Sequence, residues 1–144
     1  MPFADCGKAP LGVYPLVDRA NLLEPLLDAG IRTAQLRIKD LSGSALSAEI
    51  EQAVTFSERY QTRLFINDAW QLAIEAGAYG VHLGQEDLAA LDPTEIDQIR
   101  QAGLRLGIST HTPKELEWAA QFQPSYLAIG PVFETRSKQL DYQT

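Results

Sequence analysis

Residues 102–115 read Ala102-Gly103-Leu104-Arg105-Leu106-Gly107-Ile108-Ser109-Thr110-His111-Thr112-Pro113-Lys114-Glu115, and this stretch decides the fold. Its glycine at position 103 follows a helix-like segment and suits the left-handed position that ends many helices. The run 104–108 is short, apolar and rich in branched side chains, as a buried strand is. Thr112 precedes a proline and stands three residues before a glutamate, which is typical of a capped helix start. Helix, strand and helix are therefore predicted in direct succession.

The same succession recurs along the chain. Apolar runs predict six strands, at 12–17, 33–38, 64–66, 80–83, 104–108 and 126–129. Helical spacing of apolar residues predicts helices at 21–29, 44–60 and 70–76, and two more helices begin at the caps Asp92 and Thr112. Glycine ends a helix at positions 30, 77 and 103. Strands that alternate with helices indicate a parallel sheet covered by helices.

Such a sheet either closes into a barrel or stays open and doubly wound. The first strand is not followed by the Gly-x-Gly-x-x-Gly turn of dinucleotide-binding sheets, so that version of the open fold lacks support. Residues 1–144 make a single domain without a linker. A closed barrel of eight strands takes ~250 residues, so we expect an incomplete (β/α)-barrel domain with about six βα units, two short of a full barrel.

Composition and charge exclude several classes of protein. The chain has 45% hydrophobic and 22% charged residues, the balance of an ordinary globular protein. No apolar run reaches the ~20 residues that cross a bilayer, and the first residues lack a secretion signal, so we expect a cytoplasmic protein without a membrane partner. The net charge of −7 argues against a nucleic-acid surface. Cys6 is the single cysteine, which excludes an internal disulfide.

Polar and apolar residues alternate in Gln35-Leu36-Arg37-Ile38-Lys39. Because side chains alternate between the two faces of a strand, Gln35, Arg37 and Lys39 share one face, which in a barrel is the interior. Two cations there need an anion such as a diphosphate, at the mouth where barrels bind their substrates. An edge strand with a solvated charged face gives the same pattern, and alternation alone does not separate the two interpretations.

Acidic residues follow the next two predicted strands. Asn67 and Asp68 end the first of them, although the same pair is common in turns. Glu86 and Asp87 follow the second, where they either open a turn or face the mouth. Because these strands are neighbours, we expect Asp68 and Asp87 to lie close together. Two carboxylates beside a diphosphate suit Mg²⁺, and we favour the metal site over the turn.

The histidines and one serine are weaker candidates. His82 lacks the spacing of a metal site and is expected to be a hydrogen-bonded interior residue, while His111 is expected to be a loop residue. Ser109 ends its strand at the same mouth, where its hydroxyl would donate to a phosphate. The sequence places no base beside Ser109, so we do not expect a serine nucleophile.

The final strand leads through Gly130 into a polar loop. This loop holds two hydroxyls and two cations, at Thr135, Arg136, Ser137 and Lys138. Loops of this composition are common on protein surfaces, but the position directly after a strand end favours an anion-binding loop.

Taken in order, these motifs resemble the thiamine-phosphate synthase family. The resemblance runs from about Gly12 to Lys138 and rests on residues 35–39, 66–68, 80–87, 107–111 and 130–138. It implies a TIM (β/α)8-barrel type of fold and a Mg²⁺-dependent enzyme of thiamine biosynthesis. The implied substrates are small molecules, 4-amino-5-hydroxymethyl-2-methylpyrimidine diphosphate and 4-methyl-5-(2-phosphooxyethyl)thiazole. Their coupling gives thiamine phosphate and pyrophosphate.

The resemblance also implies roles for single residues. Gln35 would hold the pyrimidine with Ser109 beside it, and Asp68 and Asp87 would bind Mg²⁺. The diphosphate would contact Arg37, Lys39, Asn67 and Lys138, and the thiazole phosphate would contact Thr135 and Ser137. Serine replaces the commoner threonine at position 137 and keeps the hydroxyl. The implied mechanism is dissociative, so Lys138, Arg37 and Ser109 would contribute to catalysis by stabilising charge and placing the substrate rather than as nucleophiles.

Two other interpretations remain open at this point. A relative of the thiazole tautomerases would share the fold, but it would bind a monophosphate and have no use for the diphosphate residues. A truncated, inactive binding or interaction module would keep the fold without the reaction. In any of these cases, a sheet of six strands leaves two open edges, through which we expect self-association.

Overall fold

The computed structural model describes residues 1–131. Six parallel strands form one sheet in the order β1-β2-β3-β4-β5-β6, so each strand lies beside its neighbour in sequence. The strands are Leu16–Val17 (β1), Thr33–Leu36 (β2), Arg63–Asn67 (β3), Gly80–Leu83 (β4), Arg105–Thr110 (β5) and Tyr126–Ile129 (β6). The helices between them are Ala20–Asp28 (α1), Gly43–Tyr60 (α2), Trp70–Ala76 (α3), Gln85–Ala89 (α4), Pro93–Gln101 (α5) and Pro113–Ala120 (α6).

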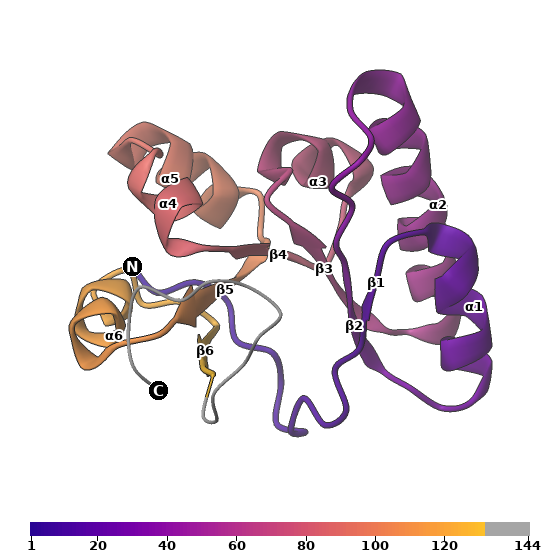
Figure 1. Ribbon diagram of the computed structural model, residues 1–144, viewed down its shortest axis with the longest axis horizontal. Coiled ribbons are helices and arrows are strands. Elements are labelled where there is room, and N and C mark those ends of the chain that lie inside the picture. The colour runs from indigo at the N-terminus through magenta and orange to yellow at the C-terminus, as the bar shows by residue number, and fades with distance from the viewer. Residues whose placement is uncertain (132–144) are drawn as a thin grey trace.

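The sheet curls, and the helices lie along its outer face (Figure 1). Apolar side chains of the strands and helices fill the space between the two layers and form the core. The largest fully buried members of this core are Leu23, Leu27, Leu36, Ile50, Leu64, Ile66, Leu83, Leu88, Ile99, Leu106 and Ile108. The opposite row of each strand faces the concave interior, because successive side chains of a strand point to opposite faces.

The predicted succession of strands and helices is confirmed, with differences at the ends of elements. The run at 12–17 contributes only a two-residue strand, and the run at 33–38 leaves the ladder after Leu36. Strand β5 continues to Thr110, two residues beyond its prediction. The short helix α4 was not predicted, and Glu86 and Asp87 lie in its first turn. The edge-strand interpretation of residues 35–39 is wrong, because β2 pairs with β1 on one side and β3 on the other.

The helix caps form as the sequence predicts. Asp92 accepts a hydrogen bond from the backbone N–H of Glu95 at 2.8 Å, and Thr112 Oγ1 accepts one from Glu115 N–H at 3.1 Å. Each satisfies a backbone donor that the first helical turn leaves without a partner. The glycine at position 77, which follows α3, has a φ of +69°, in the left-handed region where a side chain would be strained.

Aromatic rings fill the concave interior near the middle of the sheet. Phe65 of β3 is fully buried and stacks on Tyr14 with 5.8 Å between ring centroids. The ring of Tyr126 of β6 meets Phe65 edge-on at 5.1 Å. Glycine makes room for these rings, since a Cβ at Gly80 would lie 2.7 Å from the Phe65 ring and one at Gly107 2.1 Å from the Tyr126 ring.

The N-terminal segment, residues 3–10, lies across the amino ends of the strands. The backbone N–H of Phe3 donates to the Gln123 carbonyl at 3.0 Å, and Arg105 Nε donates to the Asp5 carbonyl at 3.0 Å. Arg63 donates to three carbonyl oxygens of the segment, those of Cys6, Ala9 and Pro10, at 2.7–2.9 Å. The segment therefore ties β3 to β5 and to the turn before β6.

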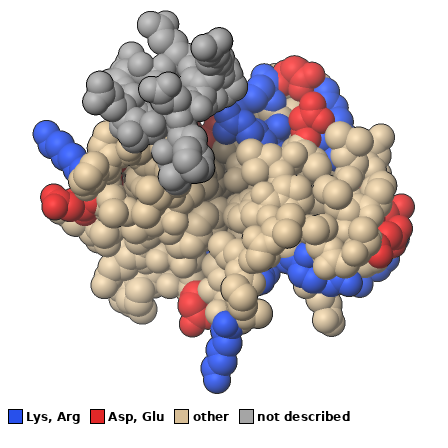
Figure 2. All heavy atoms as spheres, turned by 60° about the horizontal axis from the view of Figure 1, so that its bottom comes forward, with Lys and Arg blue, Asp and Glu red and all other residues tan. Residues whose placement is uncertain are grey.

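Charged side chains gather at the margins of one face of the molecule. Figure 2 shows acidic and basic groups side by side there, around a broad uncharged area. Among the described residues, no helix is both long and apolar enough to span a bilayer.

Candidate functional site

A polar pocket of about 490 Å³ opens at the carboxyl ends of β2, β3, β4 and β5. Side chains that end these strands, or follow them directly, supply most of its lining. The lining residues are Arg37, Lys39, Asn67, Asp68, His82, Gly84, Gln85, Glu86, Asp87, Ser109, His111 and Glu115. The parallel sheet brings these residues together, because parallel strands all end at the same edge of the sheet.

The pocket contains most of the residues that the sequence marks as candidates. Six of them line it: Arg37, Lys39, Asn67, Asp68, Asp87 and Ser109. Gln35 is buried at 3% exposure, two residues before Arg37 on the same strand, and does not line the pocket. Thr135, Ser137 and Lys138 lie outside the described residues.

Lys39 and Asp68 form an ion pair across the pocket. Lys39 Nζ donates to Asp68 Oδ2 at 2.7 Å, and the side chains are 54% and 33% exposed. Asp68 has a φ of +63°, and its backbone N–H donates to the His82 carbonyl at 3.0 Å. Asp68 is therefore a turn residue that also lines the pocket. The turn interpretation and the site interpretation of Asn67-Asp68 are compatible.

Asp87 lies beside Asp68. Its side chain is largely exposed at the pocket rim, yet its pKa is raised, first by partial desolvation and then by the hydrogen bond and negative charge of Asp68. The positive charge of Lys39 opposes this rise. Two carboxylates in contact repel one another when both are ionised, and a bound cation would remove that cost.

Asn67 adds a third oxygen at the same place. Its side chain is 8% exposed, and its Oδ1 atom has no hydrogen-bond partner among the described residues. No group of three or more His, Cys, Asp or Glu side chains suited to a metal occurs within residues 1–131. The donor set is thus two carboxylates with a nearby amide oxygen, which fits Mg²⁺, a cation that takes one or two carboxylates together with substrate phosphate oxygens and water.

His82 is an interior residue, as the sequence predicts, and it is held on both ring nitrogens. Nδ1 lies 2.6 Å from the Tyr126 hydroxyl and Nε2 lies 2.6 Å from Ser109 Oγ. Burial lowers the pKa of His82 to about 4, against a rise from the charge of Asp68, while Arg37 lowers it further. The ring is therefore uncharged at neutral pH.

The contact with Ser109 corrects one premise of the sequence analysis. A base does lie beside Ser109, because the parallel ladder pairs β4 with β5 and sets His82 next to it. A serine nucleophile still does not follow. The second ring nitrogen meets a phenol instead of a carboxylate, and an imidazole with a lowered pKa is a weak base.

Tyr14 and Tyr126 contribute polar contacts that were not predicted from the sequence. Tyr14 Oη and Tyr126 Oη lie 2.5 Å apart, and Gln35 Nε2 donates to Tyr14 Oη at 3.3 Å. Aromatic residues in apolar runs are typical of cores, so nothing in their immediate neighbourhood marks them as polar contacts. The available signal was Gly107, a glycine inside a strand, which often indicates the close approach of another group.

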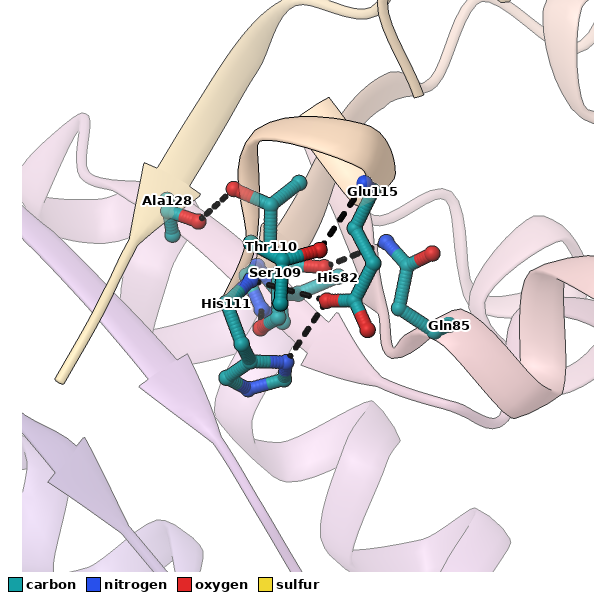
Figure 3. Close-up of polar contacts among 8 residues, drawn as sticks. His82, Gln85, Ser109, Thr110, His111, Glu115 and Ala128 are labelled. Atoms are coloured by element: carbon teal, nitrogen blue, oxygen red, sulfur yellow. Dashed lines mark hydrogen bonds and ion pairs between the residues drawn. The ribbon is translucent and has the colours of Figure 1, made fainter. Parts of the chain in front are cut away.

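The remaining wall of the pocket is braced around the end of β5 (Figure 3). Gln85 Nε2 donates to the Ser109 carbonyl at 2.8 Å, and Thr110 Oγ1 donates to the Ala128 carbonyl at 2.9 Å. Glu115 Oε1 accepts from the backbone N–H of His111 at 2.8 Å and lies 3.0 Å from its Nδ1. These contacts fix the strand end that carries Ser109.

The sequence comparisons agree on one family. The family model described as thiamine monophosphate synthase matches residues 14–144. Thiamine-phosphate synthases of Cronobacter sakazakii and Shigella sonnei are each 54% identical over 130 residues, which is 90% of this chain and 60% of each relative. The chain thus spans about 60% of the length of the curated relatives that it matches.

A solved structure of similar fold supports the barrel type of fold. The thiamine phosphate pyrophosphorylase of Pyrococcus furiosus superposes with a TM-score of 0.74 at 24% identity, over 85% of this chain and 61% of that one. The resemblance inferred from the motifs and the expected barrel type of fold are confirmed.

Proposed function

Because the chain belongs to the thiamine monophosphate synthase family, we propose that it acts in thiamine biosynthesis as a transferase. The proposed reaction couples 4-amino-5-hydroxymethyl-2-methylpyrimidine diphosphate with 4-methyl-5-(2-phosphooxyethyl)thiazole, giving thiamine phosphate and pyrophosphate. The described residues would supply the pyrimidine diphosphate side of this site. The absence of disulfide chemistry in a chain with one cysteine agrees with action in the cytoplasm.

One observation carries the proposal: two cations and two neighbouring carboxylates converge in a single pocket at the carboxyl edge of the sheet. Among the described lining residues, four are acidic and two are basic. A diphosphate alone would meet excess negative charge there. It binds favourably only if a divalent cation accompanies it, which is the reason to include Mg²⁺ in the site.

The proposed roles follow from these positions. Asp68 and Asp87 would hold Mg²⁺, which when bound neutralises charge on the diphosphate oxygens. Arg37 and Lys39 would contact the same oxygens directly, and Asn67 would donate through its amide N–H. Ser109 would contact the pyrimidine, with Gln35 deeper in the interior. Lys138, Thr135 and Ser137 would complete the site from outside the described residues.

In the proposed reaction, the bond between the pyrimidine methylene carbon and the diphosphate oxygen breaks first, and pyrophosphate leaves with the bonding electrons. The thiazole nitrogen then attacks the resulting cation. Arg37 and Lys39 stabilise the negative charge that builds up on the departing group, and this accounts for a site without an activated nucleophile.

Two assays test the proposal in this chain and in its variants. Calorimetry measures binding of the pyrimidine diphosphate with and without MgCl₂, and a coupled assay measures pyrophosphate release when both substrates are present. We expect binding that requires Mg²⁺ and that weakens at least tenfold in Arg37→Ala, since charge-assisted contacts to phosphate are lost. Arg59→Ala removes an exposed arginine of α2, outside the pocket, and is the matched control.

The outcomes separate the competing functions. Binding with measurable pyrophosphate release supports the synthase. Binding without release supports a binding module. Equal binding with and without Mg²⁺, unaffected by Arg37→Ala, would rule out the proposed diphosphate site.

A further inference from the structure

A continuous chain of polar contacts crosses the concave interior beneath the pocket. Gln35 Nε2 donates to Tyr14 Oη at 3.3 Å, and Tyr14 Oη lies 2.5 Å from Tyr126 Oη. Tyr126 Oη lies 2.6 Å from His82 Nδ1, and His82 Nε2 lies 2.6 Å from Ser109 Oγ. The five residues, here called the relay, come from the segment before β1 and from β2, β4, β5 and β6.

Counting hydrogens gives the relay a direction. A phenol has one hydrogen to donate, and an uncharged imidazole has one N–H and one acceptor nitrogen. With Gln35 donating to Tyr14, either direction leaves one hydrogen outside the relay, that of Tyr14 in the interior or that of Ser109 at the pocket. Because an interior donor without a partner is costly, the favoured arrangement has Tyr14 donating to Tyr126 and Tyr126 donating to His82 Nδ1. The His82 N–H is then on Nε2 and donates to Ser109 Oγ.

We propose that Tyr14, Tyr126 and His82 are positioning residues that hold Ser109 as a hydrogen-bond donor to the substrate. With its oxygen occupied by the His82 N–H, the Ser109 hydroxyl turns its own hydrogen into the pocket that it lines. In the reverse arrangement, Ser109 would donate to His82 and present only an acceptor. The relay therefore selects a ring with an acceptor, such as a pyrimidine nitrogen, facing Ser109.

The other end of the relay agrees with this direction. Gln35 Nε2 donates to Tyr14 Oη, while Gln35 Oε1 is buried with no partner among the described residues, so the Tyr14 oxygen is an acceptor and its hydrogen is left for Tyr126. Gly107 is independent support, because its missing Cβ is what lets the Tyr126 ring reach His82. A larger residue at position 107 would close the path that the relay follows.

The direction is testable without substrate, by ¹⁵N NMR of the imidazole rings at neutral pH. The chain has two histidines, so His111→Gln assigns the remaining signals to His82. We expect Nε2 protonated and Nδ1 unprotonated in the unmodified chain. Tyr126→Phe removes the donor to Nδ1 and should bring the two tautomers to a mixture, with at least a fivefold change in their ratio.

A more distant variant separates the relay from local packing. Tyr14→Phe keeps the ring and all contacts of His82, yet it frees Tyr126 to accept from Nδ1 as well as to donate to it. We expect the tautomer ratio of His82 to change in Tyr14→Phe as it does in Tyr126→Phe. Tyr79→Phe, whose ring also packs on Phe65 but whose hydroxyl is outside the relay, is the matched control and should leave the ratio unchanged. A protonated Nδ1 in the unmodified chain, or an unchanged ratio in both relay variants, would overturn the proposal.

The consequence for binding rests on the proposed function and is measured separately, with the pyrimidine diphosphate and MgCl₂. Losing the orientation of one hydroxyl should weaken binding about fivefold in Tyr126→Phe. In a Ser109→Ala background the same change should have no further effect, because the hydroxyl that the relay orients is gone. Equal effects of Tyr126→Phe with and without Ser109 would contradict the positioning role. If the tautomer shifts as expected but no ligand binds, the relay stands and the proposed substrate is wrong.

Discussion

His82 is the residue whose surroundings make the clearest pH prediction. Its pKa is about 4 in the folded chain and near 6.5 when unfolded, because burial disfavours the charged ring. The unfolded chain therefore takes up a proton first as pH falls. The stability that the uncharged ring contributes is fully present above pH 6.5 and is lost between pH 6.5 and 4, by up to ~3 kcal/mol.

Two measurements check this prediction. The ring signals of His82, assigned in His111→Gln, should titrate well below pH 5.5. Urea unfolding at pH 7 and pH 5 should show a lower free energy of unfolding at pH 5, with a smaller difference in His82→Asn. A titration midpoint near 6.5 would mean that the ring is open to solvent.

Asp87 and Asp68 make a prediction about metal alone. Their mutual repulsion means that MgCl₂ should raise the melting temperature of the unmodified chain, since a ligand that binds the folded state stabilises it. In Asp87→Asn the repulsion is relieved, so the metal-free melting temperature should rise slightly and the response to Mg²⁺ should be lost. Glu86→Gln, one residue away on the same helical turn, should keep the response. Differential scanning fluorimetry measures all three, and a full response in Asp87→Asn would remove Asp87 from the metal site.

At the scale of elements, strand β5 depends on Gly107. An added Cβ would lie 2.1 Å from the Tyr126 ring, so Gly107→Ala must displace that ring or spread β5 from β6. Overpacking of this kind costs about 1–3 kcal/mol, which we expect as a loss in the free energy of urea unfolding. Gly84→Ala is the control, because its Cβ would meet only Asp87 at an ordinary 3.8 Å. Similar stability losses at the two positions would show that the Tyr126 ring moves freely.

The elements also show what the sequence could and could not predict. Periodicity and glycine located β4 and β6 to the residue, and the cap signals located α5 and α6. Helix α4 was not predicted, because five residues are too few to show a helical period. Its acidic residues, Glu86 and Asp87, are also common in turns. The run at 12–17 is apolar but lies mostly outside the ladder, and the hydroxyl of Tyr14 within this run meets that of Tyr126.

The site was predictable only in part, as the elements were. Residues that follow a strand end, such as Lys39, Asp68 and Asp87, could be placed because parallel strands share an edge. The contact between His82 and Ser109 could not, since it depends on the register of β4 against β5. The register of two strands depends on how they pack in three dimensions, so it cannot be predicted from a single sequence.

At the scale of the whole molecule, the sheet ends in two strands that pair on one side only among residues 1–131. These are β1 and β6, and they expose Leu16 at 55% and Ile129 at 68%. Unpaired parallel edges with apolar side chains favour pairing with another chain. We expect the 144-residue chain to self-associate at micromolar concentration in size-exclusion light scattering, and Ile129→Lys to shift it toward the monomer. A stable monomer in both would show that the edges are covered.

The N-terminal segment has a consequence for the order of events during synthesis. Phe3, Ala4 and Asp5 leave the ribosome long before their hydrogen-bond partners Gln123, Ser125 and Arg105. Until then Phe3, which is 5% exposed in the folded chain, remains exposed to water or bound to a chaperone. Residues 3–5 can therefore dock only after residues 105–125 have been made, and a nascent chain stalled before β6 carries this apolar segment undocked.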